Sequence, residues 1–180
     1  MIGRTLLLLA WLVTLAGCAP RSEDTTNNER DAASSDPGYL AHDAEFVETD
    51  TEGRTRYRLR AAQARQNPTT RELQLRSVIM DMQAASGERW NLRAERGHMP
   101  PRSRRLELAG DVRLESRLAD GVLQIRTASI VYDIDAGRAR APGAVTLRTR
   151  GGELAAHAVA IDIKARRVSL ESKVHGHFAP

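Results

Sequence analysis

The sequence predicts an all-β domain of many short antiparallel strands, and two observations lead to that fold class. A seven-residue phrase occurs four times, as RLRAAQA (58–64), NLRAERG (91–97), QIRTASI (124–130) and ELAAHAV (153–159). Polar and apolar residues also alternate within the repeats, as in RRLELAGDVRLES (104–116) and RVSLESKVHGHF (167–178). Alternation over runs this short is typical of half-buried strands. We therefore expect two facing antiparallel sheets or a slit barrel.

Residues 1–17 predict a bacterial lipoprotein signal peptide. Arg4 supplies a positive charge, LLLLAWLVTLA (6–16) is apolar throughout, and small residues precede Cys18 in LAGC (15–18). The apolar run is shorter than the about 20 residues that a transmembrane helix needs. An uncleaved anchor with an incidental cysteine is the alternative. Cys18 is the only cysteine, so its lipidation would leave the domain without a disulfide.

Residues 18–36 predict a flexible tether that starts at the lipidated cysteine. The stretch RSEDTTNNERDAASSD (21–36) holds no apolar residue larger than alanine. Such a segment buries too little surface to offset the entropy that it would lose on ordering. Residues 37–180 are the right length for one domain with its own core.

The repeated phrase begins a longer unit. Equivalent apolar positions are spaced by 33, 33 and 29 residues, at Leu59, Leu92, Ile125 and Leu154. A valine follows each of them after 19 or 20 residues, at Val78, Val112, Val145 and Val174. An alternating apolar pair precedes each valine, at Leu73/Leu75, Leu106/Leu108, Ala139/Ala141 and Val168/Leu170. Turn-forming stretches separate phrase and pair, as QNPTTR, MPPRSR, DIDAGR and DIKARR. A fixed period indicates stacked supersecondary units that bury a common core.

Prolines punctuate the pattern in the way that a strand protein requires. Pro68, Pro100, Pro101 and Pro142 all fall between alternating runs. The inward side chains are aliphatic and small, since only 4% of residues are aromatic. Alternation alone does not distinguish a filled sandwich core from a lined groove, and both remain open at this point.

Composition and missing motifs argue against several functions. The net charge of +4 comes mainly from arginine, but no basic run is interleaved with aromatics, which argues against nucleic-acid binding. No Walker loop and no G-x-S-x-G occur. His175 and His177 would share one face of a strand without a third ligand at a recognisable spacing, so we expect no metal site. Asp133 and Asp135 flank a turn before Gly137, which favours turn chemistry over acid–base catalysis. We expect no enzyme and no cofactor.

Several motifs follow one another in a specific order. They are Tyr39, TEGRTRYRLRA (51–61), WNLRAERG (90–97), LELAGDVRLES (106–116), LQIRTASIVYDIDAGRARAPGAVTLRTRGGEL (123–154) and LESKVHGHF (170–178). In this order, residues 37–180 resemble the LptC family of lipopolysaccharide export proteins. The most specific pieces are W-x-L-x-A, L-x-G-x-V and T-x-x-L/I-x-Y-D-x-x-x-x-x-A-x-x-P-x-x-V.

The resemblance implies an open-edged, twisted β-jellyroll with OstA/LptA-like repeats and an aliphatic groove. It implies a relay that takes lipopolysaccharide from an LptBFG-type ABC transporter and passes it to an LptA-type periplasmic bridge protein. The location would be the periplasmic face of the inner membrane. Family members typically keep an uncleaved N-terminal helix, whereas the lipobox here suggests a lipid anchor. Another LptA-like envelope lipoprotein, with a lipid-binding or purely structural role, is the alternative.

The alternation and the resemblance together predict two sets of site residues. The first set faces inward as candidates for the groove lining: Phe46, Leu59, Leu75, Leu92, Leu108, Ile125, Leu147, Val168 and Phe178. The second set forms a C-terminal edge that pairs with the bridge protein: Val168, Leu170, Ser172, Val174 and Gly176.

Overall fold

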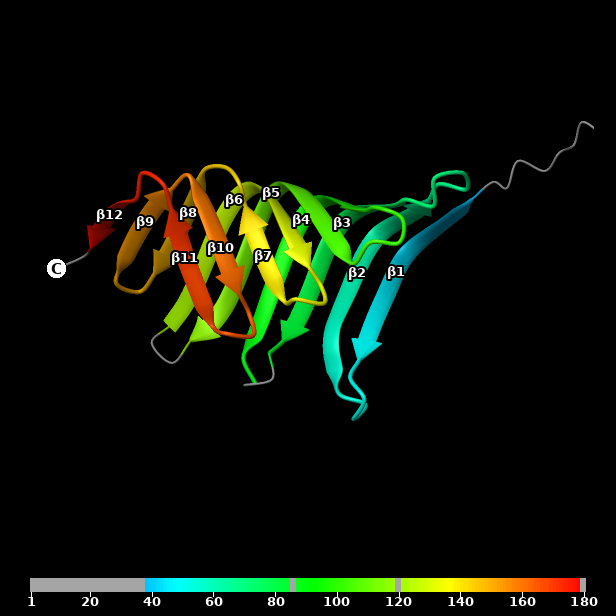
Figure 1. Ribbon diagram of the computed structural model, residues 1–180, viewed down its shortest axis with the longest axis horizontal. Coiled ribbons are helices and arrows are strands. Elements are labelled where there is room, and N and C mark those ends of the chain that lie inside the picture. The colour runs from blue at the N-terminus through cyan, green and yellow to red at the C-terminus, as the bar shows by residue number, and fades with distance from the viewer. Residues whose placement is uncertain (1–37, 85–86, 119–120, 179–180) are drawn as a thin grey trace, which may run out of the picture. The chain divides into compact units, whose positions relative to one another are not determined.

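The computed structural model describes residues 38–84, 87–118 and 121–178. The predicted signal peptide, Cys18 and the tether lie outside these residues. The described strands form one antiparallel sheet, shown in Figure 1. The twelve strands are β1 (Tyr39–Thr49), β2 (Thr55–Gln66), β3 (Leu73–Gln83), β4 (Arg89–Met99), β5 (Arg105–Leu118), β6 (Gly121–Asp133), β7 (Arg138–Ala141), β8 (Val145–Thr149), β9 (Gly152–Ala156), β10 (Ala158–Asp162), β11 (Arg167–Glu171) and β12 (His175–Phe178).

The sheet forks at β6. Strands β1 to β6 pair in chain order, each with the next. The second edge of β6 pairs with β7 along 131–133 and with β8 along 124–127. One branch continues from β7 to β10 and β11, and the other from β8 to β9 and β12. In Figure 1, β7, β10 and β11 lie in front of β8 and β9.

The fork continues a line of bends that crosses the long strands, which we call the corner. In β1 and β3 the bend falls at Asp43 and Ser77, whose φ angles are 51° and 53°. In β5 it falls at Gly110 and Asp111, where the register with β4 and β6 shifts. Beyond β6 the bend becomes an interruption between two separate strands, at residues 142–144, at His157 and at residues 172–174. Glycine or a short polar residue occupies most of these positive-φ positions, because larger side chains clash there.

The corner divides the sheet into two walls. Wall A comprises residues 39–42, 63–66, 73–76, 96–99, 105–109, 129–133, 138–141, 158–162 and 167–171. Wall B comprises residues 44–49, 55–61, 78–83, 89–94, 112–118, 121–127, 145–149, 152–156 and 175–178. The prediction of an all-β jellyroll with two facing layers is confirmed, although the two layers belong to a single forked sheet.

The corner also explains the sequence repeat. The second residue of each phrase is apolar and faces inward in wall B. The phrase then crosses the corner and ends in wall A with a buried residue such as Ala64 or Ile130. The alternating pair then returns along wall A, and in the first three repeats the valine is the first residue after the corner, whereas Val174 lies within the break at 172–174. Val78 and Val112 are each 1% exposed at that point. Each repeat is therefore one bent hairpin that contributes two strands to each wall.

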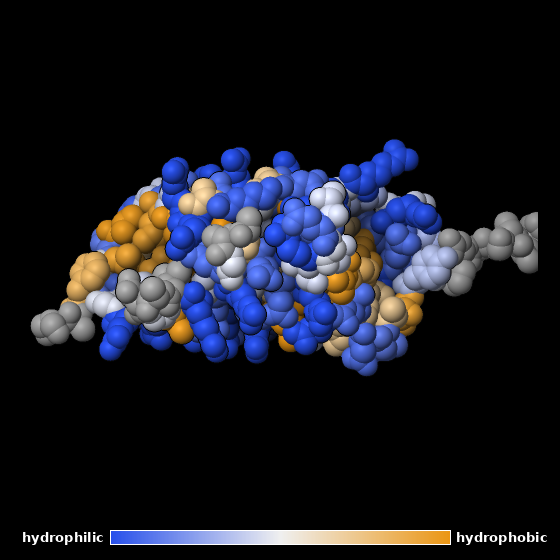
Figure 2. Space-filling model, turned by 90° about the horizontal axis from the view of Figure 1, so that it is seen from below, coloured by the Kyte–Doolittle hydropathy of each residue, from blue (hydrophilic) through white to orange (hydrophobic). Residues whose placement is uncertain are grey.

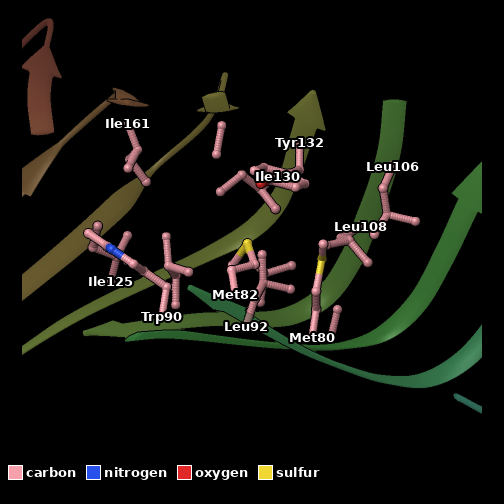
Figure 3. Close-up of a cluster of buried hydrophobic side chains, with 14 of the residues drawn as sticks. Met80, Met82, Trp90, Leu92, Leu106, Leu108, Ile125, Ile130, Tyr132 and Ile161 are labelled. Atoms are coloured by element: carbon pink, nitrogen blue, oxygen red, sulfur yellow. The ribbon is translucent and has the colours of Figure 1, made fainter. Parts of the chain in front are cut away.

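The core lies between the two walls. Its members come from both, and Figure 3 shows Ile130, Tyr132 and Ile161 of wall A pointing toward Met82, Trp90 and Leu92 of wall B. All six are buried. Burial of one such side chain contributes about 1.5–3 kcal/mol, so the contact between the walls is the main source of stability for the domain.

Candidate functional site

All nine groove candidates lie on the inward face. Six of them are buried, namely Leu59, Leu75, Leu92, Leu108, Ile125 and Leu147. Val168 is half-buried, since it pairs with buried Ile161 of β10. Phe46 and Phe178 are 38% and 72% exposed, yet their cross-strand partners place them on the same face. The structure describes their orientation, whereas lipid contact at these residues remains a prediction.

Five of these candidates belong to one row that crosses every strand of wall B, which we call the core row. The row follows the register through Phe46, Leu59, Met80, Leu92, Leu114, Ile125, Leu147, Leu154 and Gly176. Its central members are almost completely buried, with Met80 at 0% and Leu114 at 1% exposure. Sequence reasoning did not select Met80 or Leu114. The alternation in SVIMDMQ and VRLES contains the signal that would have found them.

The core row reaches the surface at both ends of the sheet. At β1, Phe46 is 38% exposed. At the other end, Phe178 of β12 lies over Gly176, and Leu154 is only half-buried. Figure 2 shows hydrophobic residues gathered at these two ends, with hydrophilic residues across the middle of the face. The apolar interior is thus accessible at its ends and covered along its length.

Charged side chains cover the gap between the turn-bearing ends of the two walls, which we call the mouth. The Arg104 guanidinium, at the end of wall A, bonds Glu48 at the end of wall B. Arg104 also donates to Asp135 over 3.0 Å, and Arg56 donates to Glu48 over 3.0 Å. These carboxylates, Glu48 first, raise the pKa of the Arg104 guanidinium. The group therefore stays charged at every physiological pH.

Two tyrosines lie directly inside this charged cluster. Burial raises the pKa of Tyr132 to about 12. Burial, followed by the negative charge of Glu48, also raises the pKa of Tyr57. The two phenols belong to opposite walls, since Tyr57 pairs with Met82 and Tyr132 with Leu106. The mouth thus changes from charged to apolar within one layer of side chains.

The predicted C-terminal edge is split between the two branches. Val168 and Leu170 lie in β11, whereas Gly176 lies in β12 and pairs with Leu154. The predicted edge does not extend through Ser172 and Val174, which lie in the break between β11 and β12. Ser172 and Lys173 have φ angles of 61° and 46° there, and the Ser172 carbonyl accepts the His157 N–H over 3.0 Å. The chain turns the corner here with two consecutive residues of positive φ, and this turn separates β11 from β12.

The free edge of β11 presents the backbone of two predicted residues. Ile163 donates its N–H to the Gly137 carbonyl, which fixes the alternation of ladder bonds between β7 and β10. In an antiparallel sheet, N–H and C=O groups point to one neighbour at every second residue. When this alternation is followed across β10 to β11, the backbone N–H and C=O groups of Arg167, Ser169 and Glu171 point toward β10. The groups of Val168 and Leu170 therefore point away from the sheet.

Surface hollows lie along the outer faces of the walls, and one of them also reaches the mouth. That hollow, of about 1180 Å³, includes Arg58 and Arg93, whose side chains point outward from wall B, and extends to Glu88 and Trp90 at the mouth. Another of about 610 Å³ lies on the outer face of wall A, around Val131 and Ala160. Among the described residues no three His, Cys, Asp or Glu side chains gather to hold a metal, and no helix is long and apolar enough to cross a membrane.

A forked antiparallel sheet around an aliphatic row that emerges at both edges defines an open-edged β-jellyroll. The chain belongs to the LptC-related family of lipopolysaccharide-assembly proteins, whose profile matches residues 5–179. The resemblance found in the sequence is thereby confirmed, and the family identifies the protein as a component of lipopolysaccharide transport.

The fold is similar to that of a solved transport component. The crystal structure of LptH, the LptA-homologous periplasmic component of the conserved lipopolysaccharide transport device from Pseudomonas aeruginosa, matches with a TM-score of 0.55. The match covers 69% of this chain and 95% of that chain at 12% identity, so it concerns the fold. A comparison of the sequence with curated proteins finds no match.

Proposed function

We propose that the protein is a membrane-tethered relay that accepts lipopolysaccharide from an LptBFG-type inner-membrane transporter. It then passes the lipid to an LptA-type bridge protein of the same fold. Membership of the LptC-related family supports the transport role. The observation that carries the proposal is the core row, which runs across wall B from Phe46 at one edge to Leu154 and Gly176 at the other.

The core row matches the chemistry of acyl chains. Each CH₂ group removed from water contributes about 0.8 kcal/mol, so an aliphatic channel binds chains without specific polar contacts. The phosphorylated sugars of the lipid would stay in water outside the mouth, where the surface is hydrophilic. Transfer along such a channel needs no covalent step. The energy would come from ATP hydrolysis by the transporter, and the relay itself would act without catalysis.

The C-terminal end supports the hand-over to the bridge protein. β11 and β12 each have one paired neighbour among the described strands. The outward backbone groups of Val168 and Leu170 can accept a strand from a second chain. Leu170 and Val168 also point their side chains inward, so a strand added here would extend the apolar interior into the next domain.

The membrane attachment is part of the proposal. The LAGC sequence ending at Cys18 supports a lipid anchor followed by the tether at 18–36, on the periplasmic face of the inner membrane. Mass spectrometry of membrane-extracted protein should find Cys18 as the first residue, carrying diacylglyceryl. An intact N-terminus at Met1 would show instead an uncleaved anchor.

Site-specific photo-crosslinking tests lipid transport inside the jellyroll. Crosslinkers at the inward positions Phe46, Val168 and Phe178 should capture lipopolysaccharide in cells, because these residues are accessible and belong to the interior face. Their chain neighbours Val47, Arg167 and His177 point to the opposite face and provide matched controls. Equal labelling of both sets would indicate adsorption to the surface and contradict the proposal.

The filled interior favours a second candidate, a structural envelope lipoprotein. Six of the nine candidates have at most 6% exposure, as expected of a core that never opens. The same experiment separates the two functions. A structural lipoprotein would leave inward and outward crosslinkers alike without lipopolysaccharide, and it would not co-purify with the transporter.

A further inference from the structure

Two ion pairs connect the walls across the mouth. Glu48 in β1 and Arg104 in the β4–β5 turn are 56 residues apart in the chain. Glu88, which precedes β4, and Arg166, in the β10–β11 turn, lie 2.5 Å apart. In each pair the carboxylate belongs to the end of wall B and the guanidinium to the end of wall A. Both arginines are substantially exposed, at 47% and 60% of the side chain.

The second pair holds a carboxylate in an unfavourable position. The Glu88 side chain is only 15% exposed. One of its oxygens bonds Arg166, and the other is buried without a hydrogen-bond partner among the described residues. An unpaired buried oxygen carries a desolvation cost. Movement of Glu88 into water would recover that desolvation cost, so burial of this oxygen favours separation of the pair.

The mouth is closed beneath these pairs. Ile134 and Ile163, which follow β6 and β10 at the end of wall A, are 2% and 4% exposed. Met82 and Trp90 cover the facing end of wall B at 4% and 3%. Interiors packed in this way hold no free space for an acyl chain. Chains can enter from the side only if the walls separate, and the two ion pairs must then break.

We propose that Arg104 and Arg166 each form a phosphate-binding site at the mouth, exchanging Glu48 and Glu88 for the phosphate groups of a lipid headgroup as the walls separate. The inference rests on the proposed function. A guanidinium binds phosphate through two parallel hydrogen bonds, and a phosphate monoester carries about −1.5 to −2 charges against −1 for a carboxylate. Phosphate can reach both arginines because their side chains are exposed, and the exchange also releases the buried, unpaired oxygen of Glu88.

The site couples head recognition to chain entry. An amphiphile with phosphates on its head would release both carboxylates at the moment when its chains need the open mouth. An uncharged amphiphile would have to break the same pairs without replacement. Phosphorylated lipid should therefore enter more readily than the same lipid without phosphates, although its head remains in water.

The test measures binding of two probes to the full-length protein: diphosphorylated lipid A and the same lipid after phosphate removal. The native protein should prefer the diphosphorylated form. The double variant Arg104→Gln/Arg166→Gln should lose roughly tenfold in affinity for it, because one charged hydrogen-bonding group is lost per phosphate. It should bind the dephosphorylated form at least as tightly as the native protein does, because the two closing ion pairs are absent. Arg104→Lys/Arg166→Lys keeps the positive charge, so its affinity for diphosphorylated lipid A should lie between those of the native protein and of Arg104→Gln/Arg166→Gln.

Two further variants complete the test. Arg138→Gln/Arg140→Gln removes two exposed arginines from the outer face of wall A, where they pair with Asp162 and Glu171, and should leave the preference unchanged. Glu48→Gln/Glu88→Gln weakens closure and should improve binding of both probes. Inorganic phosphate at millimolar concentration should compete only weakly with diphosphorylated lipid A. If inorganic phosphate bound as tightly as the lipid does, the site would be one for free anions.

The outcomes separate this inference from the function on which it rests. Failure of the native protein to bind either lipid would overturn both the relay and the phosphate site. Strong binding with a preference that survives Arg104→Gln/Arg166→Gln would leave the relay in place and overturn the phosphate site alone.

Discussion

Gly97 of β4 lies opposite Leu75 of β3, so closely that a Cβ added to Gly97 would come within 3.2 Å of the Leu75 Cβ and 3.1 Å of a Val78 methyl. The φ angle of Gly97 is not in the left-handed region, so space rather than backbone conformation requires glycine here. Gly97 is the last residue of the second repeated phrase, where the other phrases have the buried residues Ala64, Ile130 and Val159. The small residue lets the neighbouring Leu75 and Leu108 fill the layer.

Gly97→Ala should therefore destabilise the domain by overpacking. We expect a loss of about 1–3 kcal/mol in the free energy of unfolding, measured by urea denaturation. Gly143→Ala is the control, since nothing lies within 4 Å of its added Cβ, and it should change stability by less than about 0.5 kcal/mol. Equal effects of the two substitutions would show that the close packing at Gly97 is not energetically important.

The corner can be tested at Ser77, an exposed residue with a φ of 53°. Ser77→Val places a β-branched side chain in the left-handed region and should cost about 1–2 kcal/mol. Ser77→Gly relieves the same strain and should be neutral or slightly stabilising. Ser169→Val, in the extended backbone of β11, should be tolerated and serves as the control. Thermal unfolding of the three variants gives the order of their stabilities. If Ser77→Val were as stable as the native protein, the corner would not be fixed at Ser77.

Tyr132 makes stability depend on alkaline pH. Its pKa is raised by burial to about 12 in the folded protein, against 10 for the free phenol. The unfolded chain therefore loses the proton first. Stability is fully present below pH 10 and falls as the pH rises from 10 toward 12, by at most roughly 3 kcal/mol.

Tyr132→Phe should remove most of this dependence, whereas Tyr39→Phe at a 71% exposed position should not. Urea unfolding at pH 9, 10 and 11 measures the slope directly. An unchanged slope in Tyr132→Phe would assign the alkaline loss to other groups.

Local pattern predicted much of this structure, because strand alternation depends only on neighbouring residues. The positions of Leu59 and Leu108 in the polar–apolar alternation are enough to place both on the inward face. The same alternation continues through Ser172 and Lys173 in the sequence, yet the chain bends there with positive φ angles. That bend is imposed by the corner of the strands beside it, which a local pattern does not contain.

Contacts between the walls were not predictable in the same way. Glu48 and Arg104 meet because wall A and wall B are offset by several strands, and the offset follows from the twist of the whole sheet. The sequence also left the interior open to two interpretations. Its packed state depends on how the two aliphatic faces interlock, and composition alone does not determine that.

The last prediction concerns the edge of β11, where a proline substitution tests backbone pairing. Proline requires a φ near −65°, so Ser172→Pro would disrupt the corner at φ 61° and would report on folding instead of pairing. Leu170 is suitable because its N–H points away from β10. Proline is tolerated at strand edges where the missing N–H has no partner in the sheet.

Leu170→Pro should keep β10 paired with β11 and remove one donor offered to an incoming strand. Together with the distortion of the next bond, this should weaken binding of an LptA-type bridge domain by roughly tenfold. Leu170→Ala also shortens the side chain but retains the N–H, so the difference between the two variants isolates backbone pairing. Ser169→Pro removes a ladder bond to β10 and should unfold the edge. Calorimetric titration gives the affinity, and hydrogen exchange at β10 verifies that the edge is folded. If Leu170→Pro binds as tightly as Leu170→Ala while β10 stays protected, the bridge protein does not join through β11, and the join must be sought at β12 or at β1.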